Sequence, residues 1–282
     1  SQIGGGTVRY VTPDWHEWHP EPEHREEGGT PGIIESIRGA MAISIPKKVG
    51  YEVIAEKEKR HVERARAQLQ EAPGLELLGP ANAERLPIFS LRFRSDEGEL
   101  HYGFVVRLLN DLFGIQARGG CSCAGPYGHT LLDLIPEHSE ALAAEVGRGF
   151  GCLRPGWVRF NVHWLSTEEE VDYVLRAMTL IARWGSRILP SYTLDTKTGL
   201  WQHREFQEAP PASLDDFMLA EPPKALSTSC ASPVELLEIA EQALSSGAPH
   251  HHHLQAAEAH HKTPWPSKAE ALCWFLRPHD AP

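Results

Sequence analysis

The chain has 282 residues, of which 41% are hydrophobic, enough for one large or two ordinary domains with a real core. Its 38 acidic and 27 basic side chains give a net charge of -11, which argues against a nucleic-acid binder. No apolar run is long enough to span a bilayer and no signal segment opens the sequence, so we expect no membrane partner. Five cysteines do not suggest a disulfide framework and fit a reducing, cytoplasmic compartment.

Residues 1–45 combine glycine turns with one apolar periodic stretch. Gly4-Gly5-Gly6 leads into a short β-like run, and a helical spacing follows at Ile33, Ile34, Ile37, Ala40, Met41 and Ile45. Thr30 and Pro31 are expected at the start of that helix, as its cap and first residue. A helix start preceded by glycines can bind an anion such as phosphate, although an ordinary capped helix is the alternative.

Residues 46–190 alternate between helical and strand patterns. We expect helices over 50–72, 102–113, 131–146 and from Ser166 or Thr167 to Trp184, and strands over 75–78, 88–93, 115–118 and 157–164. The alternation of Phe89, Leu91 and Phe93 with polar residues is that of a half-buried strand. Such an order around a small sheet predicts an α+β layer domain.

The segment from Arg118 to His129 suits neither a helix nor a strand interior. It contains Cys121 and Cys123, four glycines and a proline, so a shaped loop is predicted. Because apolar segments flank it on both sides, this loop could present a thiol for chemistry. A glycine-rich turn with two incidental cysteines is the alternative.

Beyond Pro190 the composition changes. Turn residues between short apolar pieces predict a hairpin-like extension over 191–206. Residues 207–282 are rich in proline and histidine and are expected to form a largely disordered tail, with one short helix over 234–244. The histidines at 250–253, 260 and 261 could bind a metal, but no carboxylate or cysteine stands at a firm spacing from them.

Four motifs in a fixed order resemble the C-terminal half of class V aminotransferase-fold enzymes, the pyridoxal-phosphate (PLP) group that includes cysteine desulfurases. These are Gly4-Gly5-Gly6-Thr7-Val8, the segment from Arg25 to Pro31, the Arg118–His129 loop, and Val158-Arg159 followed by Thr167-Glu168-Glu169-Glu170. The resemblance covers residues 1–185. It implies an α/β and α+β fold in which residues 1–45 end the large PLP-binding domain and 46–190 form the small C-terminal domain. It also implies an amino-acid substrate and a homodimer.

The resemblance implies a role for three residues. Thr30 matches the residue that reaches the PLP phosphate of the partner subunit. Arg159 matches the arginine that pairs with the substrate carboxylate, for which a guanidinium fork is well shaped, although a surface strand arginine is the alternative. Cys123 matches the cysteine that takes sulfur as a persulfide, and Arg118 or His129 could lower its pKa. The desulfurase loop usually has histidine where this chain has Cys121 or Ser122.

PLP chemistry requires a Schiff-base lysine, which in the family lies in a Ser-x-His-Lys segment upstream of the triple glycine. The lysines here, such as Lys47, Lys57 and Lys197, stand in charged or turn contexts. We therefore expect a fragment of a longer gene product that is inactive alone. We also expect apolar surface around Ile33, Ile34, Ile37 and Met41 to be exposed.

Two functions stay open at this point. The first is part of a PLP-dependent transaminase, cysteine desulfurase or lyase. The second is a non-catalytic binding module that handles sulfur or metal through Cys121, Cys123, Cys152 and the histidine tract.

Overall fold

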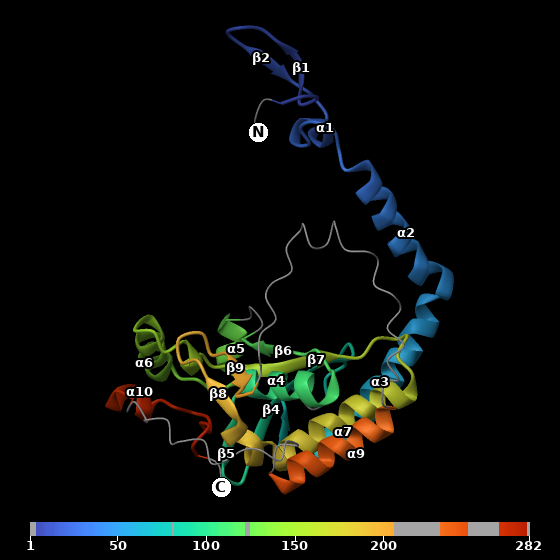
Figure 1. The fold of residues 1–282 in the computed structure, drawn as a ribbon. Coiled ribbons are helices and arrows are strands. Elements are labelled where there is room, and N and C mark those ends of the chain that lie inside the picture. Colours follow the sequence, from blue (N-terminus) through green and yellow to red (C-terminus); the bar gives the residue numbers. More distant parts are fainter. Residues whose placement is uncertain (1–3, 81, 122–124, 206–231, 248–264, 281–282) are drawn as a thin grey trace. The chain divides into compact units, whose positions relative to one another are not determined.

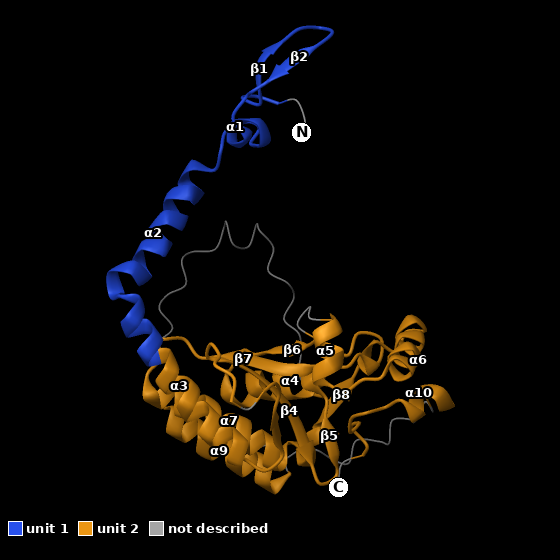
Figure 2. Ribbon diagram, turned by 180° about the vertical axis from the view of Figure 1, so that it is seen from behind, with its two compact units in different colours: residues 1–57 blue, residues 58–282 orange. Residues whose placement is uncertain are grey.

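A computed structural model describes residues 4–80, 82–121, 125–205, 232–247 and 265–280. The chain divides into two compact units, Ser1–Lys57 and Glu58–Pro282 (Figure 1, Figure 2). None of the described helices is long and apolar enough to cross a membrane.

The first unit contains a small hairpin and a long helix. Strands β1 (Val8–Val11) and β2 (His16–Trp18) pair antiparallel, and a short helix α1 (Pro22–Glu26) follows. The N–H of Gly29 donates to the carbonyl of Gly5 at 2.7 Å, so the two glycine runs lie against each other. Helix α2 (Ile33–Val49) comes next, and α3 (Tyr51–Glu71) continues from it across the boundary between the units.

Helix α2 buries none of its residues. Ile34 and Met41 are each 64% exposed, and Ile33 and Ile37 are also exposed. The expectation of unburied apolar surface is therefore confirmed. Exposed apolar surface of this kind normally marks an interaction surface, and none of the described residues buries it.

The start of α2 differs from the prediction. Gly32 is its N-cap and Ile33 its first residue, whereas Thr30 lies in the bend before it. Thr30 therefore lies two residues before the cap, and its side chain does not cap the helix. Gly32 makes no side-chain cap, so among the described residues the N–H groups of Ile34 and Glu35 have no cap, whereas the Ile33 N–H donates to the Pro31 carbonyl at 2.8 Å.

The second unit is built on an antiparallel sheet with the strand order β3-β4-β7-β6, in which β5 also pairs with β4. The strands are β3 (Leu75–Leu77), β4 (Ile88–Ser95), β5 (Gly98–Leu100), β6 (Arg118–Gly120) and β7 (Trp157–Asn161). Phe89, Leu91 and Phe93 of β4 are buried, which confirms the alternation predicted for this strand.

Helices cover the apolar face of this sheet. Helix α4 (Tyr102–Phe113) contacts β4, β6 and β7, and α7 (Glu168–Trp184) contacts α4 and β4 (Figure 1). Helix α7 begins with a capping box in which the Thr167 hydroxyl accepts from Glu170 N–H, as the sequence suggested. Two 3₁₀ helices are also present, η1 (Gly151–Leu153) and η2 (Gly185–Ser191), and η2 contacts α7.

The Arg118–His129 segment is less of a loop than predicted. Residues 118–120 form β6, and helix α5 (Gly125–Leu131) begins shortly afterwards, followed by α6 (Pro136–Gly147). Pro126 stands in the first turn of α5, where a missing N–H costs nothing, so the glycine and proline content did not prevent a helix.

In the C-terminal extension the described residues contain the hairpin predicted over 191–206 and the helix predicted over 234–244, and residues 265–280 are also packed. Strands β8 (Tyr192–Leu194) and β9 (Trp201–His203) form a hairpin, α9 (Pro233–Ser246) packs on α7, and a short α10 (Ser267–Ala271) follows. Leu237, Leu244 and Phe275 belong to the core. The composition of this segment gave no indication that the aromatic residues near Phe275 would be packed. The histidine tract lies outside the described residues.

Candidate active site

The face of the sheet opposite α4 and α7 carries the candidate carboxylate-binding residue. Arg159 on β7 stands directly opposite Ser90 on β4 and Arg118 on β6. Side chains in register on antiparallel strands point to the same face, so the two arginines are neighbours there. Arg159 is half-buried, and its guanidinium has no hydrogen-bond or ion-pair partner within the described part of the chain. It is therefore able to receive an acidic ligand.

The cysteine segment leaves the sheet through a tightly packed turn. A Cβ on Gly119 would lie 2.8 Å from the Tyr102 ring, and one on Gly156 would lie 2.7 Å from the backbone of Gly120. Gly120 itself has φ +118°, a conformation that other residues rarely adopt. The glycines thus fix the direction in which the chain reaches Cys121, which is exposed. Cys123 lies outside the described residues.

Helix α5, which follows the cysteine segment, rests on β7. A Cβ on Gly128 would lie 3.3 Å from the six-membered ring of Trp157, so glycine allows this close contact. His129 contacts its own helix, with Nδ1 2.8 Å from the Gly125 carbonyl. The Trp157 indole N–H is buried and has no hydrogen-bond acceptor among the described residues.

Thr30 belongs to the other unit and is exposed. It precedes the uncapped start of α2, where free N–H groups and the positive end of the helix dipole favour an anion. Thr30 and Arg159 thus belong to different units of the chain.

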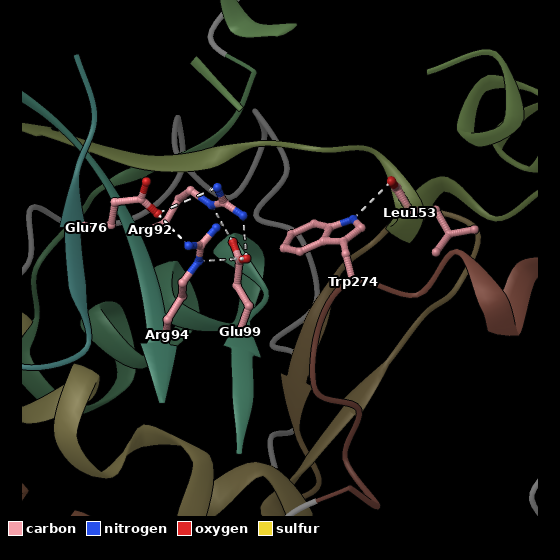
Figure 3. Close-up of polar contacts among 6 residues, drawn as sticks. All are labelled: Glu76, Arg92, Arg94, Glu99, Leu153 and Trp274. Carbon is pink, nitrogen blue, oxygen red and sulfur yellow. Dashed lines mark hydrogen bonds and ion pairs between the residues drawn. The ribbon is translucent and has the colours of Figure 1, made fainter. Parts of the chain in front are cut away.

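The same sheet face carries a charged cluster whose pairing the sequence did not reveal. Arg92 Nε and Nη2 donate to Glu99 at 2.9 and 2.6 Å, and Arg94 Nη1 lies 3.2 Å from a Glu76 oxygen (Figure 3). Burial alone would lower the pKa of Arg92, but the hydrogen bonds and charge of Glu99 raise it overall. Because these arginines are neutralised, they are poor candidates for binding a further anion. The alternation of arginines along β4 was the only signal of this cluster in the sequence.

A small pocket of about 60 Å³ lies beside this cluster, between Arg92, Glu99, His138, Leu142 and Trp274. Ligand pockets usually enclose several hundred Å³, so this one is too small for a cofactor. Trp274 is fixed there by its N–H, which donates to the Leu153 carbonyl at 3.1 Å (Figure 3).

His101 is buried where α4, η1, the β8–β9 hairpin and the C-terminal segment meet. Its Nδ1 accepts from Gly103 N–H and Trp201 Nε1–H, both at 3.0 Å, and its Nε2 donates to the Cys152 carbonyl at 3.1 Å. Burial lowers the pKa of His101 to about 4. These contacts require the neutral ring, so the residue has a structural role rather than acid–base chemistry.

Cys152 is also unsuited to chemistry. It is fully buried, and burial raises the pKa of its thiol to about 12, so it stays protonated, whereas nucleophilic and metal-binding cysteines are thiolates. Within the described ranges, no group of three or more histidine, cysteine or acidic side chains could hold a metal ion.

Comparison with known proteins agrees with the motifs. The family model for aminotransferase class-V matches residues 1–174, more than half of the chain. A cysteine desulfurase from Serratia proteamaculans is 30% identical over 44% of this chain and 29% of its own length. A probable cysteine desulfurase from Staphylococcus epidermidis is 29% identical over 63% of this chain and 36% of its own.

A solved structure extends the likeness to the fold. The apo structure of a cysteine desulfurase from Thermococcus onnurineus NA1 has a TM-score of 0.51 and 28% identity, covering 64% of this chain and 38% of that one. The chain thus belongs to the class-V aminotransferase family and has part of its mixed α/β fold. It spans about a third of the length of the relatives described.

Proposed function

We propose that this chain is part of a PLP-dependent enzyme that acts on an amino acid, as a transaminase, cysteine desulfurase or lyase. The observation that carries the proposal is Arg159, a half-buried cation with no partner among the described residues, at the position where the family motif has its carboxylate-binding arginine. A guanidinium fork orients a carboxylate through two parallel hydrogen bonds, which would fix the amino acid relative to the cofactor.

The residues present fit one end of PLP. Thr30 and the free N–H groups at the start of α2 suit its phosphate, and a partner subunit's cofactor is the proposed ligand. When bound, PLP supplies an electron sink that stabilises negative charge on the substrate's α-carbon. None of the described lysines stands in a Ser-x-His-Lys segment, so we propose that the lysine comes from residues outside this sequence and that this chain is inactive alone.

Cys123 is the proposed sulfur acceptor if the substrate is cysteine. Its thiol would become a persulfide while cysteine becomes alanine, which balances the sulfur without an external oxidant or reductant. The close packing of Gly119, Gly120 and Gly156 supports this role, since it anchors the start of the cysteine segment. A cytoplasmic homodimer remains part of the proposal.

The test uses the complete gene product. We expect a Ser-x-His-Lys segment to be encoded before Ser1 and the purified protein to bind PLP. If that segment is absent, or if no PLP binds, the enzyme proposal fails. Turnover should then be measured with cysteine and other amino acids.

Two variants separate the proposed roles. Arg159→Gln should weaken substrate binding for every amino acid, whereas Cys123→Ser should abolish sulfur transfer and leave PLP binding intact. Arg176→Gln, an exposed arginine on α7, is the matched control. The alternative of a sulfur- or metal-handling module predicts stoichiometric zinc or iron in the same preparation, without PLP.

A further inference from the structure

Two arginines from different parts of the second unit hold the same short loop after β3. Arg66 of α3 donates from Nη2 to the Ala83 carbonyl at 2.7 Å. Arg85 donates from Nη2 to the Pro80 carbonyl at 3.1 Å. Each guanidinium is thus oriented by one hydrogen bond to a backbone carbonyl, and the two carbonyls are three residues apart in the loop. Neither arginine depends on an acidic group for its position.

No described carboxylate neutralises either arginine. Neither makes an ion pair with any described residue, and the Nε–H of each is buried without an acceptor there. Burial lowers the pKa of Arg85, and the nearby positive charge of Arg66 lowers it further. A guanidinium nevertheless keeps its proton at any ordinary pH, so two uncompensated positive charges stand together.

This arrangement is unusual in a chain with 38 acidic and 27 basic side chains. Like charges held near each other are destabilising unless an opposite charge lies between them. In the cluster of Figure 3, by contrast, the positive charges of the arginines are neutralised, because each arginine contacts a glutamate. Arg66 and Arg85 therefore lack a counter-charge among the described residues, which an anion from outside the chain could supply.

The phenol hydroxyl of Tyr127 lies close to the guanidinium of Arg85, beside Gly79. A Cβ on Gly79 would lie 3.7 Å from Arg85 Nη2 and 4.0 Å from the Tyr127 hydroxyl, so both groups border the space that this glycine leaves open. Gly79 has φ +92°, which other residues rarely adopt. Tyr127 of α5 is 56% exposed and adds a neutral hydrogen-bond donor to the two cations.

We propose that Arg66, Arg85 and Tyr127 form a binding site for a tetrahedral oxyanion, a phosphate or sulfate group. Two guanidiniums match the double charge of such a group, and their N–H groups and the phenol can donate to separate oxygens. A bound anion would connect α3, the β3–β4 loop and α5, the helix that follows the cysteine segment. This inference does not depend on the proposed enzyme function.

The experiment measures binding of inorganic phosphate to the purified chain by thermal unfolding, with ionic strength held constant by sodium chloride. Phosphate should raise the unfolding midpoint above that in chloride alone. Arg66→Gln/Arg85→Gln should weaken this binding at least about tenfold, because charge-assisted hydrogen bonds are lost. Arg176→Gln should bind like the unchanged protein, and Tyr127→Phe should weaken binding to a smaller extent. Sulfate should act like phosphate, whereas acetate should have a weaker effect.

Chemical protection gives a second readout that needs no variant. Phenylglyoxal modifies accessible arginines, and phosphate should slow modification of Arg66 and Arg85 while leaving Arg176 unchanged, as read by peptide mass spectrometry. Equal modification with and without phosphate would overturn the proposal. So would a phosphate effect of full size in the double variant, which would place the anion elsewhere, such as at the start of α2.

Discussion

Two regions of the second unit differ in whether their charged and buried polar groups have partners. Around β4, β5 and the start of α4, Arg92 is paired with Glu99 and His101 makes three hydrogen bonds. On β7 and beside the β3–β4 loop, Arg159, Arg66 and Arg85 have no carboxylate partner among the described residues. In the first arrangement the charges neutralise one another, whereas in the second a positive charge keeps the capacity to bind an anion.

The largest expected effect is at the Arg92–Glu99 pair, whose side chains are only 16% and 11% exposed. Glu99→Ala leaves a buried guanidinium without its main partner, and we expect a loss of about 3 kcal/mol in the free energy of unfolding, measured in urea. Glu241→Ala, which removes an exposed partner of Arg176, is the matched control and should cost less than about 1 kcal/mol. Equal losses in the two variants would show that the pair is not a structural anchor.

The next effect concerns pH. His101 has a pKa of about 4 when folded and about 6.5 when unfolded, so the unfolded chain binds a proton that the folded chain does not between these values. Stability should therefore fall by about 3 kcal/mol, from this group alone, as pH decreases from 7 to 4. His101→Phe cannot titrate and should show a smaller fall in urea unfolding at the same pH values. Identical pH slopes would contradict the neutral, buried assignment.

A smaller effect is expected at the Arg64–Asp172 pair, in which the side chains are 37% and 39% exposed. The hydrogen bond from Arg64 lowers the pKa of Asp172, so its contribution is present above the unfolded pKa and is lost as pH falls through the folded pKa. Asp172→Asn should cost about 0.5 kcal/mol at pH 7, because solvent screens exposed pairs. Urea unfolding in low and high salt would test this, since salt should reduce the difference.

The smallest effect on stability is expected at Arg159. It has no partner within the described ranges, so Arg159→Gln should change the free energy of unfolding by less than about 0.5 kcal/mol. Arg92→Gln, on the neighbouring strand and the same face, should be clearly more destabilising. A large loss for Arg159→Gln would mean that this arginine has a structural role after all.

Local patterns predicted much of the second unit. The alternation along β4 and the cap at Thr167 depend on residues a few positions apart, so they can be read from neighbours in the sequence. The exposed apolar residues of α2 were predicted instead from the family resemblance, because the tail of the large domain would lack the sheet that normally covers it. The helix at 125–131 and the packed residues 265–280 were missed, because glycine, proline and histidine content says little about what a segment contacts.

The sequence by itself determined the family, through four motifs in a fixed order, and the candidate residues Thr30, Arg159 and Cys123. Only the tertiary structure decided which charges are neutralised. Arg118 meets Arg159 through strand register, His101 meets Trp201, and Arg66 and Arg85 meet at one loop. Such contacts join residues far apart in the chain, and their free energy depends on burial and on the absence of a competing partner, which no local pattern contains.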